Sequence, residues 1–139
     1  MDTPSQIRGH LQQYYSDIVK SAGFSPSISA DGDVAFAYES YRATIKIGDD
    51  PLFFWIIVPS FWHGLNDIDF SSVIDAATAA NMETKLAKVV LWDSPSDFVN
   101  CISTELLLTD YRQAAHCLET CLQAIQNANE SFISHLKNK

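Results

Sequence analysis

The stretch Leu52-Phe53-Phe54-Trp55-Ile56-Ile57-Val58, which lies between Pro51 and Pro59, is the longest apolar run of the chain. Aromatic and β-branched residues fit a pleated surface better than a helix, so the run predicts a strand. Successive side chains of a strand point to opposite faces. One face then carries Phe53, Trp55 and Ile57, and the other carries Leu52, Phe54, Ile56 and Val58. Because both faces are apolar, we expect a central strand with helices on one side and a further helix or a partner chain on the other.

Shorter segments with strand periodicity lie on both sides of this run. Apolar and small or polar residues alternate over 34–39, a turn near Ser40 follows, and a second alternating segment covers 41–47. The turn Gly48-Asp49-Asp50-Pro51 leads into the apolar run, so the three strands form an antiparallel meander. Two further strands are expected at 88–93 and 98–108. In the last of these, alternation places Ser103 and Glu105 on one face and Ile102 and Leu106 on the other.

Three helices complete the predicted order. Thr3-Pro4-Ser5-Gln6 has the pattern of a capping box and starts the first helix. Gly23 is the C-cap that ends this helix. Asp69 or Ser71 begins a second, alanine-rich helix, and Thr109 or Asp110 begins a third. The apolar positions expected in the second helix are Phe70, Val73, Ile74, Ala77, Ala80 and Thr84, and those of the third are Tyr111, Ala115, Leu118, Leu122, Ile125, Asn129, Phe132 and Leu136.

The stripe of the third helix predicts a long helix across a sheet, although a coiled-coil seam has the same spacing. The sequence therefore predicts one α+β domain over residues 1–139, with the order α-β-β-β-α-β-β-α and a five-stranded antiparallel sheet packed by helices.

The charge of the chain limits the classes of partner. Seventeen acidic and nine basic residues among 139 give a net charge of −8, which repels phosphate backbones and anionic lipid surfaces. We therefore expect neither a nucleic acid nor a membrane as partner. The first residues lack a signal-peptide pattern, and no run approaches the roughly 18 to 20 apolar residues that span a bilayer. With three cysteines in no framework spacing, a cytoplasmic location is expected.

Residues with catalytic or metal-binding chemistry are few. His116, Cys117 and Cys121 are zinc-ligand types on neighbouring turns of one helix, but Cys117 and Cys121 also border its apolar stripe, where cysteine packs as a small hydrophobe. His63, near Asp67 and Asp69, is either an acid/base group or a solvated loop histidine. No phosphate-binding glycine loop, nucleophile elbow or dinucleotide motif is present. We expect a protein that is not an enzyme and has no cofactor.

Phe61 and Trp62 lie in the segment 60–69, which fits neither the helix nor the strand period. In a loop, two large aromatic side chains either form an exposed binding patch or close the end of a core. A pocket for a small ligand beneath this loop is a third possibility.

The element order resembles the type III secretion chaperone-like fold, and within it the YbjN-like proteins. The stretches that carry the resemblance are Asp31-Gly32-Asp33-Val34-Ala35-Phe36, the positions Phe53, Trp55, Ile57 and Val58, and the segment from Asn81 to Leu91. The resemblance implies a non-enzymatic protein that binds other proteins, often as a homodimer. It offers no catalytic residues to carry over.

We therefore expect a chaperone-like or regulatory module that binds another protein, and also a second copy of itself, through an apolar sheet face and the aromatic loop. The residues predicted to contact the partner are Phe54, Trp55, Phe61 and Trp62. The alternatives are a ligand-sensing domain with a pocket under the 60–69 loop and a small metal or thiol protein.

Overall fold

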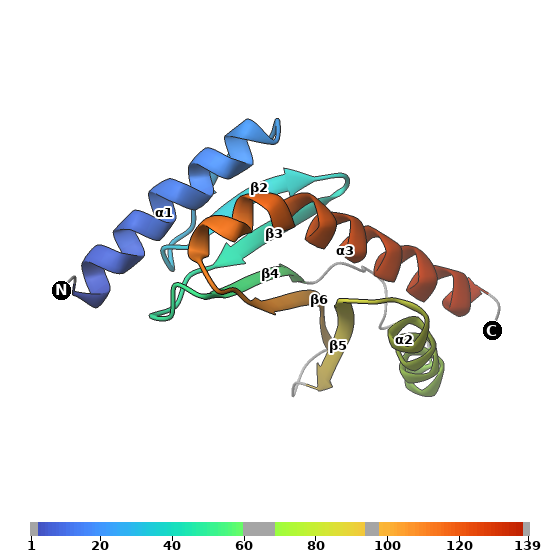
Figure 1. The fold of residues 1–139 in the computed structure, drawn as a ribbon. Helices are drawn as coiled ribbons and strands as arrows, with labels where there is room; N and C mark the ends of the chain where they lie inside the picture. The colour runs from blue at the N-terminus through green and yellow to red at the C-terminus, as the bar shows by residue number, and fades with distance from the viewer. Residues whose placement is uncertain (1–2, 60–68, 94–97, 138–139) are drawn as a thin grey trace.

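The computed structural model describes residues 3–59, 69–93 and 98–137. Its elements are α1 (Pro4–Ser21), β1 (Ser27–Ile28), β2 (Val34–Tyr38), β3 (Tyr41–Lys46), β4 (Phe53–Pro59), α2 (Phe70–Glu83), β5 (Ala87–Asp93), β6 (Phe98–Leu107), the 3₁₀ turn η2 (Tyr111–Gln113) and α3 (Ala114–Lys137). The strands form one antiparallel sheet in the order β1-β2-β3-β4-β6-β5. Helices α1 and α3 lie across one face of the sheet, and α2 lies beside β5 and the C-terminal half of α3 (Figure 1).

The apolar run is the central strand, as predicted. β4 pairs with β3 on one side and with β6 on the other. Phe54, Ile56 and Val58 point toward the helices and are almost completely buried, together with residues of both neighbouring strands. The α+β class and the β2-β3-β4 meander are therefore confirmed.

The described residues form a sheet of six strands, so the prediction of five is wrong. The additional strand, β1, is only two residues long and pairs with the start of β2, Ser27 opposite Ala35 and Ile28 opposite Val34. Two residues cannot show a period, and both β1 side chains are exposed. Local sequence therefore contains no burial pattern that predicts this strand.

Asp33 fixes the entry of the chain into β2. The residue is only 3% exposed, and its carboxylate accepts a hydrogen bond from the Ile47 backbone N–H at 2.8 Å and pairs with the Lys46 ammonium at 2.8 Å. Ser29 adds bonds to both backbone polar groups of Asp33. The turn after β1 is thereby attached to the end of β3.

Helix α1 starts as predicted, whereas its C-cap is Ala22, one residue before the predicted Gly23. The Thr3 hydroxyl accepts from the Gln6 backbone N–H, and the Gln6 side chain accepts from the Thr3 N–H, which completes the capping box. Gly23 follows the helix with a φ of +98°, which glycine adopts without steric cost. On its inner face Tyr15 packs against Phe54, with ring centroids 5.6 Å apart.

Helix α2 buries a different stripe from the one expected. Val73, Ala77 and Ala80 are buried as predicted, and so is Ala76, whereas Phe70 and Ile74 are each 41% exposed. Helix α2 packs against both α3 and β5 with the face that carries its buried alanines, because small side chains allow close approach. Phe70 and Ile74 lie outside that face. The expectation that Phe70 and Ile74 belong to the buried stripe is therefore wrong.

Helix α3 lies across the sheet, as predicted, and buries Leu118, Leu122, Ile125, Asn129 and Phe132. Asp110 caps the preceding 3₁₀ turn with Gln113 in a capping box. The helix turns Ala114 inward in place of Ala115, which is exposed. None of the helices in the described ranges is long and apolar enough to cross a membrane.

Candidate functional site

The side of the sheet that faces away from the helices carries apolar side chains. We call this surface the open face. It is formed by Thr44 and Lys46 of β3, Phe53, Trp55 and Ile57 of β4, Ser103, Glu105 and Leu107 of β6, and Lys88 and Val90 of β5. Phe53 and Val90 are each 37% exposed and Leu107 is 77% exposed. Among the described helices none crosses this side of the sheet (Figure 1).

Trp55 lies at the centre of the open face. Strand register places it between Lys46 on β3 and Glu105 on β6. Its indole N–H donates to the Ser103 hydroxyl at 2.9 Å, and the Phe53 ring centroid lies 6.1 Å from the Trp55 ring. The hydrogen bond and the ring contact hold the indole in one orientation while it remains only partly covered.

A hollow lies next to this tryptophan, over the paired strands β6 and β5. It has a volume of about 380 Å³ and is lined by Leu86, Lys88, Val90, Ser103 and Glu105. The Ser103 hydroxyl belongs both to the hollow and to the Trp55 hydrogen bond. The open face therefore combines the apolar side chains of β4 with a neighbouring depression that is lined by two aliphatic side chains, Leu86 and Val90, and two charged ones, Lys88 and Glu105.

The charged groups of this face differ in their partners. Lys46 pairs with the buried Asp33 at 2.8 Å. The Lys88 ammonium donates to the backbone carbonyls of Asn81 and Thr84, at 2.9 and 3.4 Å, at the C-terminal end of α2. Glu105 has no ion-pair partner within the described ranges, and its carboxylate accepts a long hydrogen bond from the Ser103 hydroxyl at 3.5 Å.

The predicted partner-binding residues have different positions. Trp55 is on the open face, but Phe54 is only 1% exposed and packs against α1, so it cannot contact a partner without unfolding of the core. That choice was wrong because alternation along a two-sided apolar strand does not say which face the helices cover. Phe61, Trp62 and His63, and the pocket expected under their loop, lie outside the described residues.

Residues of β6 and β5 were missed as members of a site. The sequence predicts Ser103 and Glu105 to share one strand face, and the structure confirms this, but only the pairing of β4 with β6 brings Glu105 opposite Trp55. The sequence signal that could have indicated these residues is the alternation of side chains along the predicted strand 98–108, which places Ser103 and Glu105 on one face.

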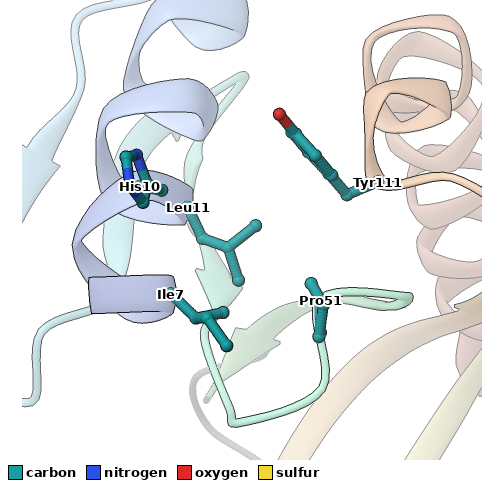
Figure 2. A pocket seen from close by; sticks show the side chains of 5 residues that line it. All are labelled: Ile7, His10, Leu11, Pro51 and Tyr111. Carbon is teal, nitrogen blue, oxygen red and sulfur yellow. The ribbon is translucent and has the colours of Figure 1, made fainter. Parts of the chain in front are cut away.

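A second depression lies on the helix side, where three distant segments meet (Figure 2). Ile7, His10 and Leu11 of α1 face Pro51 and Tyr111 across a volume of about 320 Å³. The Tyr14 hydroxyl donates to the Arg112 carbonyl at 2.8 Å, and the Tyr14 ring meets the Tyr111 ring edge to face. These contacts join α1 to the start of α3, so the depression marks a packing junction.

The predicted thiol and imidazole group is dispersed. Cys121 is fully buried in the core, and burial raises the pKa of its thiol to about 11. Cys117 is partly exposed and His116 is exposed on the same helix. The described ranges contain no group of three or more His, Cys, Asp or Glu side chains placed to hold a metal ion. Cys121 packs in the apolar stripe of α3 as a small hydrophobic residue, which is the interpretation that the sequence offered beside a zinc ligand.

Comparison with known proteins identifies the fold. No protein-family model matches the chain, and no curated protein matches it by sequence. Among solved structures it is similar to YbjN from E. coli, which is described as a candidate transcription regulator, with a TM-score of 0.63 and 13% identity over 84% of this chain and 86% of that one. The chain therefore has a YbjN-like fold, as the sequence predicted.

Proposed function

We propose that this chain is a non-enzymatic binding module that holds another protein on the open face of its sheet. The observation that carries the proposal is the set of apolar side chains, Phe53, Trp55, Ile57, Val90 and Leu107, on the side of the sheet opposite the described helices. Apolar surface of this kind gains free energy when a partner removes it from water.

The aromatic side chains of the open face support the binding of a protein partner. Aromatic residues dominate the energetics of protein interfaces, and the hydrogen bond to Ser103 already orders the Trp55 indole, so less side-chain entropy is lost on association. YbjN is described as a candidate transcription regulator. We propose for this chain a regulatory or chaperone-like role that is exerted on proteins, because the net charge of −8 disfavours direct contact with DNA. A second copy of the chain remains a predicted occupant of the same face.

Site-specific photo-crosslinking in the source cells tests the proposal. A photoreactive phenylalanine analogue replaces Leu107 on the open face in one variant and Ile74 on α2 in the matched control, since both side chains are exposed and apolar. We expect discrete protein adducts from position 107 and none from position 74. The adduct at 107 should disappear when Trp55→Ser is added, provided that urea denaturation shows the variant to be folded.

Light scattering of the purified protein at micromolar concentration separates the two kinds of occupant. A dimer mass that Trp55→Ser reduces to a monomer identifies a second copy, and a monomer with adducts at position 107 identifies a different protein. Equal crosslinking at 107 and 74, or adducts that Trp55→Ser does not affect, would contradict the proposed function.

A further inference from the structure

The occupant of the open face can be described by its chemistry, and this step rests on the proposed function. We propose that the hollow beside Trp55 takes an arginine or lysine side chain that a different protein presents between apolar residues. The argument depends on which charges of the open face already have partners within the chain.

Both lysines of the open face, Lys46 and Lys88, already have partners within the chain. The Lys46 ammonium is paired with a carboxylate that is itself buried, so its charge is balanced within the chain. The Lys88 ammonium is turned toward the carbonyls at the end of α2 and completes hydrogen bonds there. Neither lysine neutralises Glu105, which leaves one uncompensated carboxylate at the centre of the apolar surface in the described ranges.

The position of that carboxylate is suited to a cation. Glu105 lies directly opposite Trp55 in the β4–β6 ladder, a relation that places Cβ atoms about 4.5 to 5.5 Å apart. A guanidinium or ammonium group above the indole can interact with the aromatic face and pair with the carboxylate at the same time. The aliphatic wall of the hollow, Leu86 and Val90, can then cover the methylene part of that side chain.

The overall charge favours a basic partner over a second copy. Two chains of net charge −8 repel each other, whereas a basic segment is attracted over several ångströms. A second copy would also bring lysines that are already held by its own Asp33 and its own α2 carbonyls. A different protein with a free arginine or lysine does not have this restriction.

Three blocked pentapeptides test the proposal. The first is Leu-Thr-Arg-Thr-Leu. In the second, citrulline replaces the arginine as its neutral analogue, and in the third, glutamate replaces it. In an extended conformation each presents residues 1, 3 and 5 to the sheet. Binding is followed by the NMR indole N–H resonance of Trp55, which is assigned by its absence from Trp55→Phe. We expect the arginine peptide to move this resonance and to bind about tenfold more tightly than the citrulline peptide, with the glutamate peptide weakest.

Matched variants locate the source of the preference. Glu105→Gln keeps the shape of the side chain and should remove the difference between the arginine and citrulline peptides, whereas Glu119→Gln on the exposed face of α3 should leave it unchanged. Equal binding of all three peptides at Trp55 would overturn the cationic partner and leave the proposed function standing. The cationic partner would also be overturned by a stable dimer that dissociates in Trp55→Ser but not in Glu105→Gln. If no peptide moves the Trp55 resonance and position 107 gives no adducts, the proposed function itself fails.

Discussion

Single residues of this chain show how polar groups are placed in a small apolar core. Asp33 is a buried carboxylate, and it is tolerated because Lys46 and the Ile47 N–H both compensate its charge. Trp55 is treated differently, since its one polar atom is satisfied by Ser103 while part of its ring stays exposed. The first arrangement balances a charge inside the fold, and the second leaves part of an aromatic ring exposed on the open face.

Cys121 gives the stability of the protein a dependence on alkaline pH. Its thiol has an ordinary pKa of 9.0 and a pKa of about 11 in the folded protein, because burial disfavours the thiolate. Below about pH 9 both states hold the proton, and the contribution to stability is complete. Between about pH 9 and 11 the unfolded chain releases the proton first, so stability falls.

We therefore expect the free energy of unfolding of the wild type to decrease between pH 8.5 and 10.5 by about 2 kcal/mol more than that of Cys121→Val. Urea denaturation under reducing conditions measures both proteins. Burial also raises the pKa of Tyr15 to about 12. Because Tyr15 is present in both proteins, its contribution to the pH dependence cancels in the difference. Parallel pH profiles for the two proteins would show that the Cys121 thiol does not cause the dependence.

At the scale of elements, α2 covers the outer edge of the sheet. β5 is the last strand in the sheet order, so one row of its backbone N–H and C=O groups has no neighbouring strand in the described part of the chain. The Asn81 side chain of α2 bonds to both groups of Val89, accepting from its N–H at 2.7 Å and donating to its C=O at 3.0 Å. The amide thus takes the place of a neighbouring strand and blocks pairing with another chain at that point.

Substitutions at Asn81 should separate these two bonds. Asn81→Asp keeps the acceptor for the Val89 N–H but cannot donate to the carbonyl, and Asn81→Leu loses both bonds. We expect a loss of about 1 to 3 kcal/mol in each case, larger for leucine, because buried backbone groups lose their partner. Hydrogen exchange should report the difference, with the Val89 amide exchanging faster in Asn81→Leu than in Asn81→Asp.

Asn127→Asp is the control for that pair, since Asn127 is an exposed amide on α3. It should leave Val89 exchange and the urea midpoint unchanged. If Asn81→Leu keeps the wild-type exchange rate at Val89, Asn81 does not protect the edge of β5.

For the whole molecule, the open face and the net charge act against each other. The apolar residues of that face favour self-association, and the charge of −8 opposes it. Salt screens charge repulsion beyond about 10 Å at 0.1 M and leaves apolar attraction in place. The balance should therefore depend on ionic strength.

We expect the second virial coefficient at pH 7.5 to become less positive as NaCl rises from 20 to 500 mM. Leu107→Ser should weaken this trend because it removes the most exposed apolar side chain of the open face, whereas Ile74→Ser on α2 should not. Static light scattering measures the coefficient for all three proteins. An identical salt response in the wild type and Leu107→Ser would indicate that the open face does not take part in self-association.

Much of the architecture was determined by local sequence. The apolar run between the two prolines specified a central strand, the Thr3 and Gln6 pair specified the start of α1, and regular spacing specified α3. These features depend on groups within a few residues of one another, such as a side chain and a nearby backbone N–H or a repeating apolar position. The element order derived from them, together with the resemblance carried by the stretches at 31–36, 53–58 and 81–91, led to the prediction of the YbjN-like fold.

Tertiary structure alone decided which face of β4 is open and what lies beside Trp55. Alternation is symmetric between the faces of an apolar strand, so it could not distinguish Phe54 in the core from Trp55 on the surface. Glu105 is fifty residues from Trp55, and only the pairing of β4 with β6 brings the two together. The stripe that α2 buries depends in the same way on its packing against α3 and β5, which are distant in the sequence. Local sequence determined the elements, and contacts between distant segments decided the candidate site, because those contacts exist only after the elements have packed.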